Sequence, residues 1–357
     1  FTGQFSGEQH TRVHERKPEG FLERLSASTG GVIAGLCLFV LSLHVLFTNE
    51  GRALRTSSSL DEGLSQVVSL HPDLMLDPQN NNRLVHLTGT LRTAQPLYDP
   101  NYGVSVQTVK LQRRVEMYQW VEYSESRDIK ENGETKTETT YSYNTEWKSE
   151  VISSRHFDQE VGHMNPSAMA VESVTVVAPD VWVGRLFLSK GLVEQINDFQ
   201  TLSLAGLPVP VSNTFLTVSI VAMQQADQLT AFRTRAGGAL EILYMGDLSA
   251  EEVFAKEHQL NAMKTWALRL GGWALMFLSV SLSTRIIYTL VDSVPVLREL
   301  VSAGLKIFAL CVSCSLSLLT IAAGWIFYRP LLGVMIALLA LLPLLIAHAR
   351  APSKKNQ

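Results

Sequence analysis

Long apolar runs near the two ends of the chain enclose a polar middle. The last third is almost continuously apolar and divides into Trp266–Leu282, Leu305–Phe327 and Leu331–Ala347, while Gly30–Phe47 forms a further run near the start. A helix that crosses a bilayer needs about 20 predominantly apolar residues, with a range of about 17–25. The pattern therefore predicts four membrane-spanning helices, at residues 30–47, 266–283, 305–328 and 329–348.

Two other interpretations of the apolar runs fit the sequence less well. Three buried helices of a soluble core would rarely be so continuously apolar, with only short polar breaks between them. Gly30–Phe47 also resembles the apolar region of a signal peptide. However, no A-x-A cleavage site follows it, and a run of about 18 residues suits a membrane span better.

Lysine and arginine near the span ends indicate the orientation. They precede the first span, lie between the second and third, and follow the fourth: Arg12, Arg16, Lys17, Arg24, Arg285, Arg298, Lys306, Arg350, Lys354 and Lys355. The positive-inside rule then places both tails (1–29 and 349–357) and the loop 284–304 in the cytoplasm or nucleoplasm, and residues 48–265 in the lumen. Lys256, Lys264, Arg269 and Arg329 count against this placement; Arg269 and Lys306 lie at segment ends, where long cations can snorkel.

The polar middle, 48–265, reads as mainly β-structure. Strands are predicted at Arg83–Leu91, Val109–Tyr123, Lys136–Val151, Ser173–Val183, Thr214–Met223 and Leu240–Met245. Asn132-Gly133 between two β-prone runs predicts a hairpin. Helical spacing appears at Leu186–Phe199, and Ser249 with Glu252 predicts a capping box that opens a helix, Ala250–Leu268. The fold class is therefore a membrane protein of the α+β type, with four spans and a large mainly-β lumenal domain between spans 1 and 2.

Residues that carry chemistry are scattered. The sequence contains no HExxH pair, no G-x-S-x-G and no phosphate-cradling glycine loop. Cys37, Cys311 and Cys314 all lie in apolar segments, where packing is a better interpretation of the CxxC spacing than metal or redox chemistry. The formal net charge of −3 points to no nucleic-acid partner. We expect a non-enzymatic protein without cofactor or metal.

Small residues recur on one face of the third span. Ser313, Ser317, Thr320 and Gly324 follow helical spacing, and Ser315 broadens the patch. In lipid, small residues let helix backbones approach closely, and hydroxyls can bond across the contact. The pattern predicts a helix-packing seam, against other spans or between protomers. Alternatively, the hydroxyls bond only to carbonyls of their own helix.

The loop between the second and third spans has an amphipathic pattern. Its apolar positions are Ile286, Leu290, Val294, Leu297 and Val301, and polar residues lie between them. This pattern predicts a helix along the membrane surface, broken or kinked at Pro295. Packing against a partner's helix would produce the same pattern.

Several longer stretches resemble one known family. They are GFLERLS (20–26), FTNEGRAL (47–54), DPNYGV (99–104), VEMYQWVE (115–122), YSYNTEW (141–147), NPSAMAVES (165–173), SAEEVF (249–254), YTLVD (288–292) and AAGWIFYRPL (322–331). In these the chain resembles the transmembrane protein 43 (LUMA) family over nearly its whole length. Between about 204 and 214 the family is longer by some tens of residues.

The resemblance implies a four-span protein of the endoplasmic reticulum and inner nuclear membrane, with both termini nucleoplasmic or cytoplasmic. It also implies a scaffold that organises nuclear-envelope complexes, forms homo-oligomers and binds emerin and lamins. The alternative is an ion channel or channel-associated subunit, because Ser, Thr, Cys and His in the spans offer a polar path. Against a channel, the middles of the four predicted spans hold no acidic or basic residue.

Overall fold

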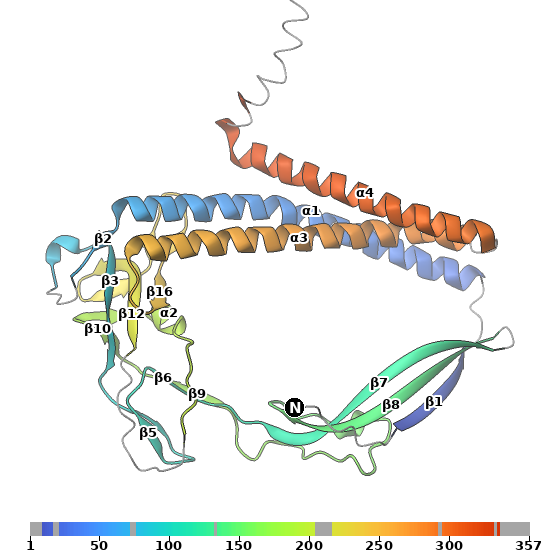
Figure 1. Cartoon of the computed structure of the whole chain (residues 1–357), viewed down its shortest axis with the longest axis horizontal. Coiled ribbons are helices and arrows are strands. Elements are labelled where there is room, and N and C mark those ends of the chain that lie inside the picture. Colours follow the sequence, from blue (N-terminus) through green and yellow to red (C-terminus); the bar gives the residue numbers. More distant parts are fainter. Residues whose placement is uncertain are drawn as a thin grey trace, which may run out of the picture. The chain divides into compact units, whose positions relative to one another are not determined.

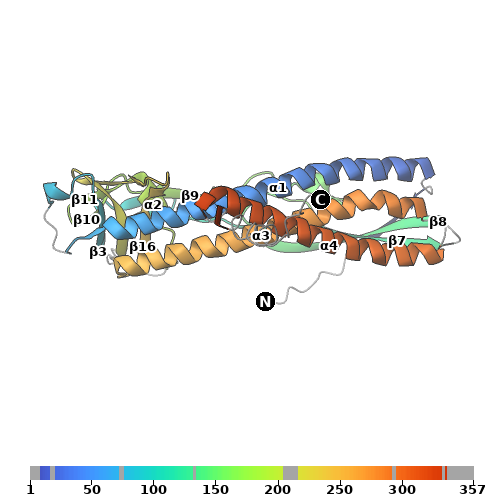
Figure 2. The ribbon, with the colours of Figure 1, turned by 90° about the horizontal axis from the view of Figure 1, so that it is seen from above.

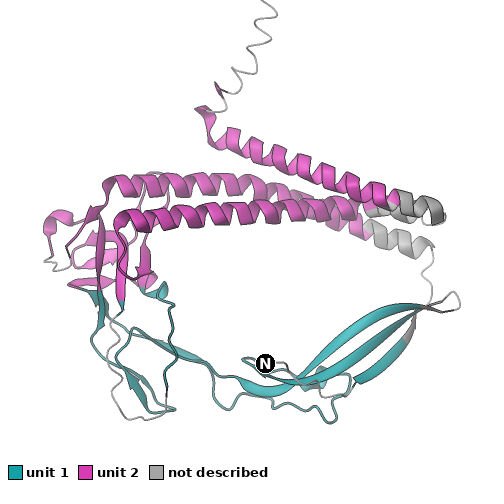
Figure 3. Cartoon of the chain, viewed as in Figure 1, with its two compact units in different colours: residues 1–22, 90–183, 193–216 teal, residues 23–89, 184–192, 217–357 magenta. Residues whose placement is uncertain are grey.

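A computed structural model describes residues 9–16, 21–71, 76–131, 134–203, 216–291, 295–331 and 334–335, and the following account concerns these residues (Figure 1). The chain forms two compact units (Figure 3). Unit 1 comprises 1–22, 90–183 and 193–216, and unit 2 comprises 23–89, 184–192 and 217–357.

Three long helices dominate unit 2: α1 (Phe21–Gln66), α3 (Ala250–Val291) and α4 (Pro295–Tyr328). α1 and α3 run antiparallel and side by side, with α4 packed along them (Figure 2). By length and composition, Gly30–Gln66, Ala250–Thr284 and Ala303–Tyr328 can each cross a membrane. Three of the four predicted spans therefore lie in such helices. The fourth, 329–348, falls largely outside the described residues.

The helices continue well past the predicted ends of the spans. α1 has 46 residues, which at about 1.5 Å per residue gives a length of about 69 Å, more than twice a hydrocarbon core of about 30 Å. Residues 48–66, which the sequence analysis assigns to the β-rich region, are thus helical. This part of α1 is held by packing: Leu60 is buried with Phe254 and Leu240, and Gly63 lies directly against the same two side chains.

The start of α3 confirms the predicted capping box. The backbone N–H of Glu252 donates to the hydroxyl of Ser249 at 3.2 Å, and the N–H of Ser249 donates to the Glu252 carboxylate at 2.8 Å. Two of the otherwise unpaired amides at the helix start are satisfied in this way.

A sheet lies against these helix ends in unit 2. β12 (Thr217–Gln225) pairs antiparallel with β16 (Ile242–Met245) and β13 (Gln228–Thr230), and β13 pairs parallel with β11 (Leu186–Leu188). β2 (Val68–Ser69) pairs parallel with β3 (Leu84–Thr93), and β14 (Phe232–Arg233) pairs antiparallel with β15 (Ala239–Leu240). A short 3₁₀ turn covers Pro78–Asn80. One cluster of the core lies between this sheet and the helix ends and contains Leu60, Leu84, Val221, Leu240, Ile242, Val253 and Phe254.

The predicted helix at Leu186–Phe199 is wrong for most of its length. Leu186–Leu188 is strand β11, and only α2 (Lys190–Glu194) is helical. Pairing of Leu186–Leu188 with β13 outweighs the helical spacing of the apolar residues. Both patterns bury the same positions, because Leu186, Leu192 and Ile196 are all in the core.

Unit 1 is built mainly from strand pairs. β7 (Met117–Glu131) and β8 (Glu134–Lys148) form a long antiparallel hairpin in which Glu131 lies opposite Glu134, which confirms the hairpin predicted from Asn132-Gly133. β6 (Lys110–Arg113) pairs with β9 (Val174–Val177), β4 (Leu97–Asp99) with β5 (Val104–Val106), and β10 (Val181–Val183) with the end of β3. A 3₁₀ turn covers Ser154–His156. Val109–Tyr123, predicted as one strand, is divided between β6 and β7.

The N-terminal tail contributes a strand that the sequence analysis does not predict. β1 (Gln9–Arg16) pairs antiparallel with β8, from Gln9 opposite Ser142 to Arg16 opposite Thr135. α1 begins shortly afterwards, at Phe21. If α1 crosses a membrane once, β1 and β8 lie on opposite faces of it. In one molecule, the pairing and the crossing therefore exclude each other.

Candidate functional site: a polar cluster shared by three helices

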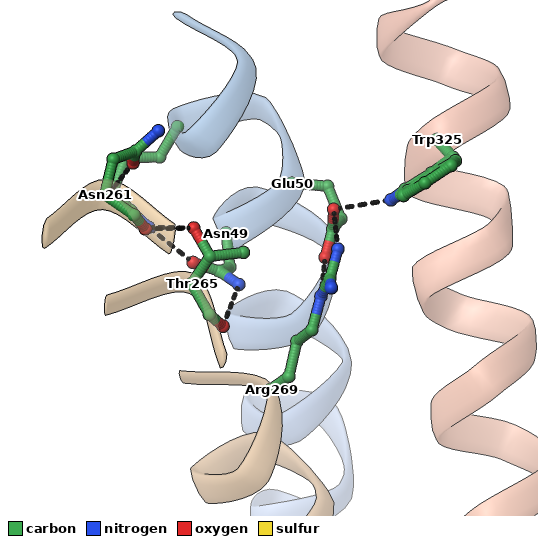
Figure 4. A network of polar contacts seen from close by, with 7 residues as sticks. Asn49, Glu50, Asn261, Thr265, Arg269 and Trp325 are labelled. Atoms are coloured by element: carbon green, nitrogen blue, oxygen red, sulfur yellow. Dashed lines mark hydrogen bonds and ion pairs between the residues drawn. The ribbon is translucent and has the colours of Figure 1, made fainter. Parts of the chain in front are cut away.

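A buried ion pair joins α1 to α3 (Figure 4). Nε and Nη2 of Arg269 each lie 2.8 Å from one carboxylate oxygen of Glu50, in a bidentate arrangement. The side chains are only 15% and 5% exposed, respectively. Such paired, charge-assisted bonds are stronger and more directional than neutral ones. From the sequence alone, Arg269 is expected to snorkel as an interfacial cation, and Glu50 is not singled out. The structure pairs the two residues instead.

α4 joins this pair through an indole group. Nε1 of Trp325 donates to Oε2 of Glu50 at 2.7 Å (Figure 4). One carboxylate thus receives hydrogen bonds from two other helices. The close approach depends on glycine: a Cβ added to Gly324 would lie 3.2 Å from Cβ and Cγ of Glu50, and Gly51 lies directly against the ring of Tyr328. α1 and α4 each contribute one glycine to the contact.

A second group of polar side chains continues the contact between α1 and α3. Arg52 donates to Asn261 at 3.1 Å and to Asn49 and Thr265 at 3.0 Å each. Two side-chain amides reach backbone carbonyls of the opposite helix: Asn49 donates to Thr265 at 3.1 Å, and Asn261 to Ala53 at 2.9 Å. The bonds that run between α1 and α3 fix the axial register of the two helices, because sliding one helix by a turn would break them.

Aromatic and cationic groups surround the cluster. The Arg269 guanidinium lies 4.8 Å from the ring centre of Trp266, and that of Arg329 lies 5.0 Å from Trp325. A cleft of about 230 Å³ between the three helices is lined in part by these residues and by Ser57 and Tyr328. Trp and Tyr are enriched where a membrane meets water. The cluster also falls at the predicted ends of the first two spans, near residues 47 and 266.

The structure places the predicted seam residues on two faces of α4. Ser313, Ser317 and Gly324 are buried, Thr320 is half-buried and Ser315 is exposed. Ser313 and Thr320 donate to carbonyls of their own helix, those of Leu310 and Leu316. The buried hydroxyl of Ser317 has no hydrogen-bond partner among the described atoms. Cys314 accepts a bond from the indole of Trp273 on α3 at 3.3 Å.

The residues of the predicted amphipathic loop belong to two helices. Ile286 and Leu290 lie in the last turns of α3, Leu297 and Val301 lie in the first turns of α4, and Val294 is outside the described residues. α4 starts at Pro295, a favourable residue for the first position of a helix. The placement of this segment on a membrane surface stays a prediction.

Comparison with known sequences identifies the family. The family model described as Transmembrane protein 43 matches residues 117–215 and 210–330. The mouse and human proteins named Transmembrane protein 43 are each 50% identical to the chain, over 98% and 97% of it and 97% and 96% of their own lengths. A Drosophila melanogaster protein named Transmembrane protein 43 homolog is 30% identical over 85% of this chain and 90% of its own length. The chain belongs to the transmembrane protein 43 family. No solved structure matches it.

The comparisons also show where this member departs from its relatives. The alignment with the mouse protein runs over 389 positions, whereas this chain has 357 residues, so the relative carries residues that this chain lacks. The two matched stretches of the family overlap at 210–215, and this overlap falls in the region near 204–214 where the resemblance implies a shortening.

A second polar cluster of this family member lies within unit 1. The hydroxyl of Tyr143 donates to Glu122 at 2.8 Å and accepts from the backbone N–H of Gln159 at 2.9 Å, and the Tyr143 ring stacks on His163 at 3.9 Å. Burial, then the bond to Glu122, raises the pKa of Tyr143 to about 12. The phenol therefore stays protonated and anchors the loop that follows β8. Among the described residues, no group of three or more His, Cys, Asp or Glu side chains is placed to bind a metal ion.

Proposed function

We propose that this transmembrane protein 43 family member is a non-enzymatic, multi-pass membrane scaffold of the endoplasmic reticulum and inner nuclear membrane. It organises nuclear-envelope complexes through self-association and binding of emerin and lamins. Family membership supports this proposal. The observation that carries it is the Glu50–Arg269–Trp325 contact, which ties three long helices into one anchor.

In the proposed orientation both termini are nucleoplasmic or cytoplasmic, and 48–265 is lumenal. The parts of α1 and α3 beyond the membrane then form a stalk, residues 48–66 and 250–265, that carries the sheet of unit 2. α1 crosses the membrane, so β1 and β8 are on opposite faces and their pairing opens on insertion.

The alternative function is an ion channel or a channel-associated subunit. Ion pathways usually present charged or carbonyl groups that are free to exchange partners with the ion. Both oxygens of Glu50 are engaged, one by Arg269 and the other by Arg269 and Trp325. A carboxylate whose two oxygens are both hydrogen-bonded within the protein favours a structural role over ion conduction.

Reconstitution separates the two functions. We expect proteoliposomes of the purified full-length chain to show no more ion flux than empty liposomes, and the same preparation to retain emerin and lamin in a pull-down. Flux that rises in proportion to the reconstituted protein, without retention of either partner, would establish the channel instead.

A further inference from the structure

We propose that, in the membrane-inserted protein, the edge of β8 binds an extended, basic segment of a lumenal partner by strand addition. This inference rests on the crossing by α1 proposed above. Its basis is that β1 occupies this edge in the structure and shows which chemistry the edge accepts, whereas a crossing by α1 removes β1 to the other face of the membrane.

The backbone contact is already complete in the structure. Eight consecutive residues of β1 pair antiparallel with β8, from Gln9 opposite Ser142 to Arg16 opposite Thr135. In strand addition, main-chain hydrogen bonds provide affinity, and side-chain sites along the edge provide specificity. An exposed edge of this length also tends to recruit other strands.

A buried carboxylate provides the side-chain site. Asp158 lies in the loop after β8, and its side chain is only 7% exposed. Its Oδ1 lies 2.8 Å from Nε of Arg12, and its Oδ2 lies 3.5 Å from Nε2 of His10. His10 and Arg12 are two positions apart in an extended strand, so they share a face. The edge thus accepts a segment that presents an arginine, and a histidine two positions before it, on one face.

Bonds to the hairpin, none of which involves β1, fix the loop backbone that carries this carboxylate. The backbone N–H of Asp158 donates to Glu122 on β7 at 2.5 Å, and the N–H of Gln159 donates to Tyr143 on β8. Glu138, the other acidic residue along this part of β8, is engaged by Arg127 of β7. When β1 leaves, Asp158 therefore remains at the edge without the guanidinium of Arg12. The 7% exposure of Asp158 includes the cover by β1, so removal of β1 opens this carboxylate to a cation of another chain.

The opposite edge of the hairpin is partly closed. Asn165 accepts from the backbone N–H of Trp120 at 2.7 Å and donates to its carbonyl at 2.9 Å, in the way that a neighbouring strand would. The side chain of Asn165 thus occupies the backbone groups of β7 at this point. The edge of β8, by contrast, is paired only with β1 among the described residues, and β1 cannot reach it once α1 crosses the membrane.

The test uses the full-length chain in lipid nanodiscs, where both membrane faces are accessible. The probe is a fluorescent peptide with the sequence of residues 9–16, QHTRVHER. We expect saturable binding that weakens at least about tenfold when the peptide carries Arg12→Ala or the protein carries Asp158→Asn. The matched control is Asp128→Asn, since Asp128 is an exposed carboxylate on β7 of the same hairpin and should leave binding unchanged.

A disulfide test separates failure of this inference from failure of the proposed topology. Thr11 and Thr140 are opposite each other, so Thr11→Cys with Thr140→Cys, in a chain whose three native cysteines are replaced, reports pairing within one molecule. Formation of this disulfide in membrane-inserted protein would show that α1 does not cross, and both proposals would fail. Absence of the disulfide together with no peptide binding, or with equal binding of the Arg12→Ala peptide, overturns the inference alone. Because the peptide variant leaves the protein unaltered, misfolding cannot explain its result.

Discussion

Each unit buries a carboxylate, but the two differ in the origin of the counter-charge. Glu50 in unit 2 is neutralised by Arg269 of the adjacent helix α3, which belongs to the same unit. Asp158 in unit 1 is neutralised by Arg12, which precedes the first predicted span, and His10 lies 3.5 Å from its other oxygen. The first carboxylate closes a contact between helices. The second depends on β1, which the proposed crossing by α1 removes, and we propose that another chain then binds there.

The most severe way to break the closed contact is Arg269→Ala. We expect a loss of about 3–5 kcal/mol in stability, because the charge of Glu50 stays buried without its partner. Thermal unfolding of the detergent-solubilised protein measures the loss. Arg55→Ala, on an exposed face of α1, is the control and should change little. The double change Glu50→Gln with Arg269→Gln should recover part of the loss; an Arg269→Ala protein as stable as wild type would contradict a structural role for the pair.

A second change tests whether the seam on α4 extends the same contact. Ser317→Leu adds bulk at a buried position that is 3% exposed, and overpacking typically costs about 1–3 kcal/mol. Ser315→Leu is a matched change at an exposed position two residues away and should cost less. Thermal stability and oligomer size in detergent give the readout, with Leu319→Ile as a further control. Equal behaviour of both serine variants and wild type would mean that the seam does not exist.

A change of pH tests the contribution of His86 to the stability of unit 2. Burial lowers the pKa of His86 below its ordinary value of 6.5. The bond to the carbonyl of Leu248 and the nearby carboxylates of Glu251 and Asp247 raise this pKa, but burial has the larger effect. The unfolded chain then binds a proton at a higher pH than the folded one. The contribution of neutral His86 to the free energy of unfolding is fully present above about pH 6.5. It declines as the pH falls from there through the pKa of His86 in the folded protein. Unfolding measured between pH 7.5 and pH 5 should show this decline, and His86→Gln should make it shallower; identical slopes would exclude His86.

The smallest expected effect is at the start of α3. Ser249→Ala removes the side chain that accepts from the N–H of Glu252, which should cost about 1 kcal/mol. Ser249→Asp keeps an acceptor and is the matched control. A cost of several kcal/mol from Ser249→Ala would show that this end of the helix is stabilised by more than its cap.

Local patterns predict much of this fold. Asn132-Gly133 predicts the hairpin of β7 and β8, Ser249 with Glu252 predicts the start of α3, and three apolar runs predict helices long enough to span a membrane. Each of these features depends on residues close together in the sequence. The helical part of α1 beyond residue 47 escapes prediction because Leu60 and Gly63 pack on Leu240 and Phe254, nearly two hundred positions away.

The polar contacts are the least predictable part. Glu50 and Arg269 are separated by 219 positions, and each alone reads as an ordinary charge at the end of an apolar run. Leu186–Leu188 forms a strand although its apolar spacing is helical, because its pairing partner β13 lies about forty residues further along the chain. The strand β1 carries no strong β-signal of its own and is defined by its partner β8.

Protection from protease tests the central claim most directly, namely that α1 crosses the membrane and separates the N-terminal tail from the hairpin. Sealed microsomes would carry the full-length chain with one epitope tag at the N-terminus and a second inserted at Asn132-Gly133. We expect added protease to remove the N-terminal tag and to leave the hairpin tag intact until detergent opens the vesicles. Digestion of both tags, or protection of both, would place β1 and β8 on the same face and contradict the account.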